Sequence, residues 1–332
     1  MRRLLVILVG GTVLLLGCGG NGDGGSTATP EASLVTITSA NAPTIASAVM
    51  SSALDTEGLS ALGGLGAIGI PVNGKTATVA MSKLGDITSI QTEWLKQQAR
   101  LGVLQAPIPE QTIPCAVGDG TMTLSGDIAN AATLTAGDNY SFAFVDCDQG
   151  DGVVIDGIFA LAITSFSGDL LSGMILLGIE VTVTGFEVDD GTDIATMNGR
   201  VQMEMDLRDP TVTSVSISTT SMTVADGTSS QTLIDFSIVQ TFDSSANTLY
   251  TLDISGSLSS SAFNGRIDFS TTVLLQNNGG EYAFSGEVVI TGTNDTSVTV
   301  FVLGTVSVEL RIDLDGNGSV DETVITTWDE LS

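Results

Sequence analysis

The sequence predicts a mainly β protein with a small N-terminal α segment, in which a long antiparallel β meander forms a curved sheet, a sandwich or an open barrel. Three observations lead to this prediction. From residue 121 onward apolar and polar residues alternate with a period of two, the apolar positions are rich in β-branched residues, and turn sequences such as Asn277–Gly280 separate the segments. With 42% apolar residues, the chain of 332 residues can bury a sizeable core.

Residues 1–17 have the pattern of an export signal. Arg2 and Arg3 precede an apolar run from Leu4 to Leu16. This run is shorter than the roughly 20 residues that a permanent membrane-spanning helix needs. We therefore expect the segment to direct secretion rather than to span the membrane.

The end of this signal, Leu15-Leu16-Gly17-Cys18, resembles the lipobox of bacterial lipoprotein precursors, with Leu at −3, a small residue at −1 and Cys at +1. The resemblance implies that Cys18 becomes the new N-terminus and carries acyl chains such as palmitate, which would anchor the protein in a membrane. Gly19, in place of Asp, implies the outer membrane, on either its periplasmic face or the cell surface. Residues 18–33 are then a flexible Gly/Ser/Thr tether. The alternative is an ordinary cleaved signal that contains a cysteine.

Export also bears on the other two cysteines. Cys115 and Cys147 would lie in an oxidising compartment, where an even pair is expected to form a disulfide. The alternative role, as catalytic or metal-binding thiols, would lack a histidine to activate them.

The charge balance disfavours several classes of function. The chain has 38 acidic and 10 basic residues, no histidine and a formal net charge of −28. A nucleic-acid partner is not expected, because phosphate contacts require Lys and Arg. The lack of histidine excludes Ser-His and Cys-His catalysis and every zinc site that uses histidine. Carboxylate chemistry of the glycosidase type remains an alternative, but no pair of acids stands out, so no catalytic residue is assigned.

A composition shift near residue 110 divides the secreted chain. Residues 34–110 carry four basic and five acidic residues, whereas 111–332 carry four basic and 31 acidic residues. We expect 34–110 to be mostly helical and 111–332 to be the acidic antiparallel β domain. The first helix would be capped by Thr44, and a second would cover about 76–101. Its apolar positions recur at helical spacing: Ile87, Ile90, Trp94 and Leu101.

Alternating segments run through the β domain and predict about ten to thirteen strands. These segments are 139–147, 153–166, 174–186, 194–207, 211–218, 231–242, 247–258, 263–276 and 281–291, followed by the clearest alternation, 298–314. In that last segment Val298, Val306 and Leu314 would share one face, with a bend at Gly304. Trp328 continues the alternation of a terminal strand and is expected to pack in the core.

The stretch Gly69–Thr76 fits the phosphate-loop pattern G-x-x-x-x-G-K-[ST]. A phosphate loop needs a preceding parallel strand and available nucleotide, but the downstream pattern is antiparallel and the protein is expected to be exported. We interpret the stretch as a turn before a helix and expect no nucleotide.

The most informative acidic motif starts at Asp313. Oxygen-bearing side chains or carbonyls at alternate positions, with a glycine at position 6, resemble a calcium loop of the EF-hand type. The candidate ligands are Asp313, Asp315, Asn317, Ser319, Asp321 and Glu322. Val324 replaces the bidentate Glu at position 12, and the flanks are strands, so the motif is closer to calcium-bearing turns between strands. It predicts a structural Ca²⁺ site with a dissociation constant of roughly 10⁻⁴ to 10⁻³ M.

Two alternatives concern these acids. The motif at Asp313 could be an acidic hairpin turn without metal, since Asp, Asn and Gly favour turns. A second acidic cluster near Cys147 could hold another cation, although a solvated loop is the simpler interpretation. Its members are Asp146, Asp148, Asp151 and Asp156.

The sequence thus predicts a lipid-anchored cell-envelope protein, not an enzyme, whose β domain binds an envelope protein, glycan or lipid or has a structural role. The first alternative is a carrier of a lipid or other apolar ligand, held in a half-barrel covered by the helices of 34–110. The second alternative is the carboxylate-based hydrolase.

Overall fold

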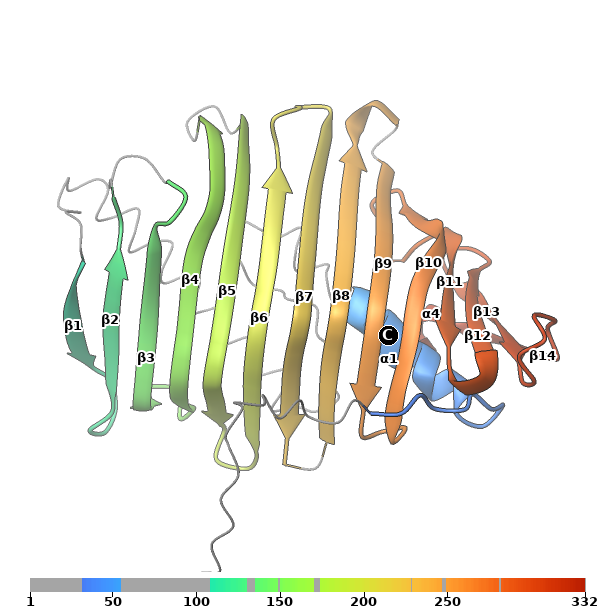
Figure 1. Cartoon of the computed structure of the whole chain (residues 1–332), viewed down its shortest axis with the longest axis horizontal. Helices are drawn as coiled ribbons and strands as arrows, with labels where there is room; N and C mark the ends of the chain where they lie inside the picture. Colours follow the sequence, from blue (N-terminus) through green and yellow to red (C-terminus); the bar gives the residue numbers. More distant parts are fainter. Residues whose placement is uncertain are drawn as a thin grey trace, which may run out of the picture. The chain divides into compact units, whose positions relative to one another are not determined.

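Within the residues that the structure describes, fourteen antiparallel strands form one open, curved sheet in which every strand pairs with its neighbours in the sequence (Figure 1). This computed structural model describes residues 32–54, 108–129, 135–148, 150–169, 174–227, 229–246, 249–280 and 282–331. The chain divides into two units, Met1–Glu31 and Ala32–Ser332, and the second contains all described residues. The predicted signal, Cys18, the 69–76 motif and the 76–101 helix lie outside them.

The strands follow one another from one edge of the sheet to the other. They are β1 (Ile108–Pro114), β2 (Thr121–Asp127), β3 (Asn139–Asp148), β4 (Val154–Asp169), β5 (Met174–Asp189), β6 (Ile194–Asp206), β7 (Val212–Asp226), β8 (Ser229–Asp243), β9 (Leu249–Ser260), β10 (Gly265–Asn277), β11 (Ser285–Thr291), β12 (Ser297–Val302), β13 (Ser307–Asp313) and β14 (Glu322–Thr327). The helices are α1 (Ala42–Leu54) and α4 (Trp328–Leu331), with single 3₁₀ turns η1 (Ser244–Ala246) and η2 (Thr293–Asp295).

The predicted fold class is confirmed as a mainly β protein with an antiparallel meander, and of the three expected forms the curved sheet is the one observed. The described residues form fourteen strands, more than the ten to thirteen expected. The expected strand at 211–218 continues to Asp226, and the expected strand at 281–291 begins only at Ser285. The segment 298–314 is not one bent strand: the chain reverses after Val302, and β12 pairs with β13. Val306 lies in this reversal and is 68% exposed, so its predicted place on the apolar side is wrong.

Apolar side chains form continuous rows across the sheet, because the strands pair in a register that keeps them on one face. One row, from β3 to β10, contains Phe142, Phe159, Val183, Gly199, Met222, Leu233, Leu258 and Ile267. A second row, from β4 to β9, contains Ile163, Ile179, Met203, Ile217, Ile238 and Ile254. We call the side of the sheet that bears these rows the apolar face; its side chains in the two rows are at most 6% exposed.

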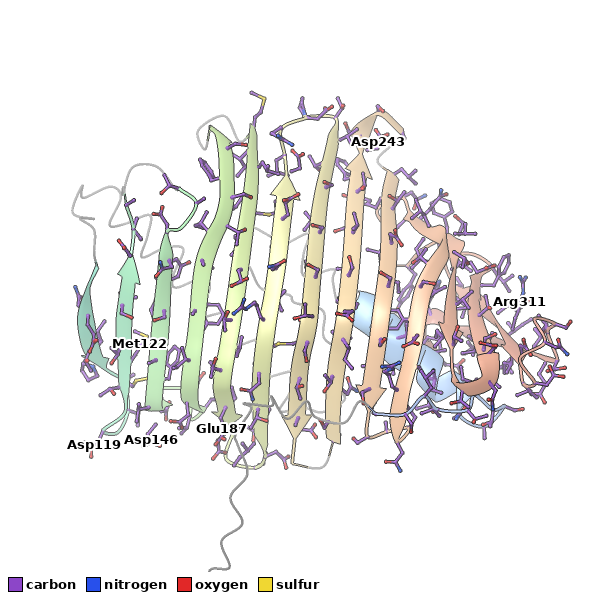
Figure 2. The ribbon with its side chains drawn as sticks, in the orientation of Figure 1. Asp119, Met122, Asp146, Glu187, Asp243 and Arg311 are labelled. Carbon is purple, nitrogen blue, oxygen red and sulfur yellow. A yellow bond between two sulfur atoms is a disulfide. The ribbon has the colours of Figure 1, made fainter. Side chains whose placement is uncertain are left out.

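The opposite side of the same strands is polar. One of its rows contains Ala162, Glu180, Gln202, Ser218, Ser237 and Ser255. Side chains stand on the strands in Figure 2, where Asp146 and Asp243 are labelled near the ends of β3 and β8. The alternation in the sequence therefore separates an apolar face from a hydroxyl-rich face.

Gly199 is the one glycine in the first apolar row. A Cβ atom there would lie 2.7 Å from the Met222 sulfur and 2.6 Å from the carbonyl oxygen of Ser221. Its φ of +148° is also a conformation that other residues rarely adopt. The missing side chain gives Met222 room to pack, so the row continues through β6.

Helix α1 begins at Ala42, two residues before the predicted cap at Thr44. The backbone N–H of Thr38 donates to Asn41 Oδ1 at 2.8 Å, and Pro43 follows in the first turn, where a missing N–H costs nothing. The buried residues of α1 are Ala42, Ile45, Ala46, Ala48, Val49 and Met50. The helix packs against β12, β13 and α4.

Trp328 begins α4 and is fully buried, which confirms its predicted place in the core. Its ring stacks on Tyr282 with centroids 5.7 Å apart, and its indole N–H donates to the carbonyl oxygen of Gly304 at 3.1 Å. Trp328 therefore holds the reversal between β12 and β13 against the end of β14.

The predicted disulfide between Cys115 and Cys147 is present and joins the end of β1 to β3. The two Cα atoms are 5.4 Å apart, and both residues are buried. A loop closed over a separation of 32 residues contributes about 3–4 kcal/mol in the chain-entropy account. The bond secures the β1 edge of the sheet.

Neither α1 nor α4, the two α-helices among the described residues, is long and apolar enough to cross a bilayer.

Candidate metal centre

The hairpin between β13 and β14 carries the acidic motif that the sequence singles out. Asp313 is the last residue of β13, and Ile312 pairs with Glu322 at the start of β14. Two hydrogen bonds close the base of the loop. The N–H of Asp321 donates to the carbonyl oxygen of Ile312, and the N–H of Leu314 donates to Asp321 Oδ2, both at 2.8 Å.

The loop is folded around the carboxylate of Asp313. The N–H groups of Gly316 and Asn317 donate to Oδ1 at 2.8 and 3.3 Å, and that of Gly318 donates to Oδ2 at 2.7 Å. Asp313 is only 6% exposed. Burial alone would raise the pKa of its carboxyl group, but these backbone hydrogen bonds outweigh burial and lower the pKa below its ordinary value. The carboxylate is therefore held ionised.

The turn η2, between β11 and β12, packs against the loop. A Cβ atom on Gly316 would lie 2.0 Å from the carbonyl oxygen of Asn294, so only glycine fits this close approach. Gly316 has a φ of +73°, and Asn294 and Asp295 in η2 also have positive φ values of 55° and 61°. Two turns from different hairpins are thus packed backbone to backbone at the metal loop.

Three carboxylates converge in this hairpin. One oxygen each from Asp313, Asp315 and Asp321 can be chosen so that all three lie within 4.8 Å of one another. Asp315 and Asp321 are exposed, whereas Asp313 is buried. Like charges this close repel, and a cation between them would remove that cost. Three of the predicted ligands are therefore brought together in a group that could hold a metal ion.

The other predicted ligands lie differently. Asn317 is tied to the cluster, since its Nδ2 donates to Asp315 Oδ2 at 2.9 Å and its Oδ1 accepts the N–H of Ser319 at 2.7 Å. Glu322 belongs to β14, opposite Ile312, and is not one of the three grouped carboxylates. Glu322 is separated from the three aspartates because it lies one residue beyond Asp321 and is paired in the strand.

The second acidic cluster does not gather into a comparable group among the described residues. Its carboxylates accept hydrogen bonds from nearby backbone instead. Asp156 Oδ1 accepts the N–H of Asp146 at 2.9 Å, and Asp148 Oδ1 accepts those of Gly150 and Gly152 at 2.7 and 3.2 Å. These acids shape the turn between β3 and β4, as the interpretation as a solvated loop predicts.

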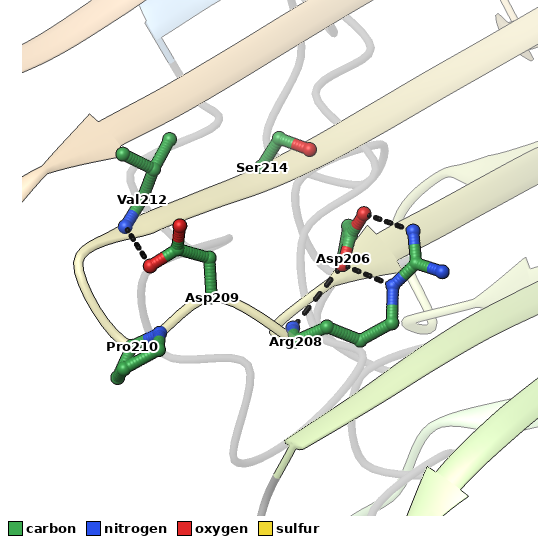
Figure 3. A pocket seen from close by; sticks show the side chains of 6 residues that line it. All are labelled: Asp206, Arg208, Asp209, Pro210, Val212 and Ser214. Atoms are coloured by element: carbon green, nitrogen blue, oxygen red, sulfur yellow. Dashed lines mark hydrogen bonds and ion pairs between the residues drawn. The ribbon is translucent and has the colours of Figure 1, made fainter.

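A hollow of about 620 Å³ at the turn between β6 and β7 was not predicted from the sequence (Figure 3). Its cation is already paired: Arg208 Nε and Nη2 donate to the two oxygens of Asp206 at 2.9 and 2.6 Å. Asp209 accepts the N–H of Thr211 at 2.8 Å. The charged groups that line the hollow thus form hydrogen bonds within the turn itself.

Hydrogen bonding by Arg208 lowers the pKa of Asp206 to about 2. The pKa of Asp209 is lowered by its hydrogen bonds to Thr211, and that of Asp243 by its hydrogen bonds to Ser245. All three carboxyl groups stay ionised at neutral pH. The general acid of a glycosidase has a raised pKa, whereas the pKa values of these three groups are lowered.

No protein-family model, curated protein or solved structure matches this chain. The functional assignment therefore depends on the chemistry of the residues themselves.

The pairing of Arg208 with Asp206 predicts a pH effect that is confined to one carboxyl group. In the Arg208→Gln variant the pKa of Asp206 should rise from about 2 toward the ordinary aspartate value of about 3.9, because the charged donor is gone. The measurement is a carboxyl-carbon NMR titration of aspartate-labelled protein. Asp209 is the internal control, since its hydrogen bonds to Thr211 remain.

The lowered pKa of Asp206 determines how the contribution of the pair to the free energy of unfolding depends on pH. A folded-state pKa below the unfolded value means that the pair stabilises the fold above about pH 3.9, and that this contribution is lost as the pH falls toward 2. An unchanged titration of Asp206 in Arg208→Gln would contradict the assigned cause.

Proposed function

We propose that the protein is a lipid-anchored component of the bacterial cell envelope whose β domain is a non-enzymatic binding or structural module stabilised by Ca²⁺. One observation carries the calcium part of this proposal: three carboxylates converge in the β13–β14 hairpin, with the buried one fixed by backbone amides. The lipobox resemblance at Cys18 supports the anchor.

The donor set suits a hard cation. Asp313, Asp315 and Asp321 offer carboxylate oxygens, which Ca²⁺ prefers, and soft sulfur or imidazole ligands are missing from the loop. Asn317 Oδ1 accepts one hydrogen bond and keeps a second lone pair that could reach an ion. Calcium levels outside the cell suit a site with a dissociation constant of roughly 10⁻⁴ to 10⁻³ M.

Binding would stabilise a marginal part of the sheet. β14 is the last strand in the order and pairs only with β13, so its other edge has no strand beside it in the described part of the chain. An ion that fixes the hairpin would also stabilise the position of Trp328, because this residue directly follows β14. Calcium is thus expected to act on stability, in keeping with a structural role.

Calcium should raise the stability of the folded protein. At about 10 mM Ca²⁺ the site should add about 1.4 to 2.7 kcal/mol to the free energy of unfolding, for dissociation constants between about 10⁻³ and 10⁻⁴ M. Thermal and urea unfolding with Ca²⁺ or with chelator measures this difference. Asp315→Ala should abolish it, whereas Asp253→Ala, an exposed change on β9, should leave it intact.

Magnesium at the same concentration is the control for general screening of the acidic surface. An equal rise with Mg²⁺, or a calcium effect that survives in Asp315→Ala, would rule out the proposed site.

The lipid anchor predicts that radiolabelled palmitate enters the protein through residue 18. Cells that express the wild-type chain should yield labelled protein that sediments with envelopes, and Cys18→Ser should lose both the label and the sedimentation. A double Cys115→Ser/Cys147→Ser variant should keep the label. Label that persists in Cys18→Ser, or never enters the wild-type chain, would refute the anchor.

A carrier of a lipid or other apolar ligand is the second candidate. The observation that favours it is the apolar face, whose two rows cross the sheet from β3 to β10. A carrier would hold its ligand on this face.

A further inference from the structure

The apolar face is buried more deeply than a single sheet can achieve. Phe159 and Leu233 are 1% exposed, and Met222 and Leu258 are fully buried. One face of a sheet must pack against another layer to remove its side chains from water. Another part of the molecule therefore has to form that layer.

The described elements are too small to do so. Helix α1 has 13 residues and is about 20 Å long, and it packs against β12 and β13. The rows of the apolar face extend over about 34 Å from β3 to β10, at about 4.8 Å per strand. α4 is a single turn that follows β14. The centre of the face, on β4 to β8, thus needs another occupant.

The order of the elements along the chain indicates which segment could cover the centre of the apolar face. Leu54 ends α1, which lies against β12 and β13, whereas Ile108 begins β1 at the opposite edge of the sheet. The two sites are separated by about 53 Å across the strands. Residues 55–107 connect them, and a segment of this length can cover that distance even if it is helical.

The sequence of this segment fits the apolar face. It is rich in Leu, Ile, Val and Ala, and its helical pattern over 76–101 would be about 39 Å long, close to the width of the rows. Ile87, Ile90 and Trp94 fall on one side of that helix. The segment also holds all three lysines of the chain and has equal numbers of acidic and basic residues, against a charge of −27 for 111–332.

We propose that residues 55–107 form the second layer of the β domain, with the side of Ile87, Ile90 and Trp94 packed on the apolar face. The face is then occupied by the protein's own chain, and a partner would meet the polar face or the turns instead. This inference stands apart from the calcium site and the lipid anchor, and it opposes the carrier alternative.

Photo-cross-linking tests the occupant directly in the full chain. Benzoylphenylalanine replaces Phe159 on β4 or Phe236 on β8, both buried on the apolar face, and Gln202 on the polar face is the matched control. Mass spectrometry of digests should find adducts with peptides of 55–107 from the first two positions and none from the third.

The other outcomes overturn the proposal. Adducts with co-purified lipid would support the carrier, adducts of doubled chain mass would indicate a second copy, and adducts with neighbouring strands alone would leave 55–107 off the face.

Tryptophan emission gives a second test that leaves the β domain unaltered. The difference between wild type and Trp94→Phe isolates the emission of Trp94, because buried Trp328 is common to both. The proposal predicts blue-shifted emission that acrylamide quenches weakly. Ile90→Asp should shift this emission to the red, whereas Thr92→Asp, on the opposite side of the helical pattern, should not. Emission and quenching like those of free tryptophan in the wild-type chain would overturn the proposal.

Discussion

The structure depends on the in-register burial of one face of a very wide sheet. Because side chains alternate along each strand, a slip of one residue would move every apolar residue of that strand to the polar face. The row that begins at Phe142 is maintained over eight strands, through the space left by Gly199. Each strand thus fixes the register of the next, and the meander propagates that order from β3 to β10.

The two edges of the sheet are secured by different chemistry. At the β1 edge, the disulfide between Cys115 and Cys147 links strands that are not adjacent in the order. At the β14 edge, Trp328 packs on Tyr282 and the acidic hairpin closes around Asp313. The same hairpin carries the converging carboxylates, so the place best suited to a cation is also one where the sheet has few other contacts to hold it.

Much of this fold could be predicted from the sequence because its causes are local. Alternation identifies strands such as β5 and β6 and assigns their faces, and the spacing of Asp313, Asp315 and Asp321 places their carboxylates on one tight loop. The reversal at Gly304 was not predicted, because its sequence has none of the paired turn residues that separate other strands. The antiparallel pairing of β12 with β13 makes that reversal evident, and the indole N–H of Trp328 donates to Gly304 within it.

Apart from the disulfide, the contacts between residues far apart in the chain could not be predicted from the sequence. The approach of Gly316 to Asn294, and the pairing of Glu322 that removes it from the aspartate group, follow from how two hairpins meet. The hollow beside Asp206 depends likewise on the turn between β6 and β7. Such contacts join residues that are far apart in the chain, and they leave no repeating pattern in the sequence.

If a second layer covers the apolar face of the middle strands, these strands are the most stable part of the domain. Hydrogen–deuterium exchange resolved along the chain measures this stability strand by strand. We expect the amides of β5 to β8 to exchange slowest, and only through global unfolding. Exchange of these strands as fast as that of β1 and β14 would contradict it, because a sheet without a covering layer would open locally throughout.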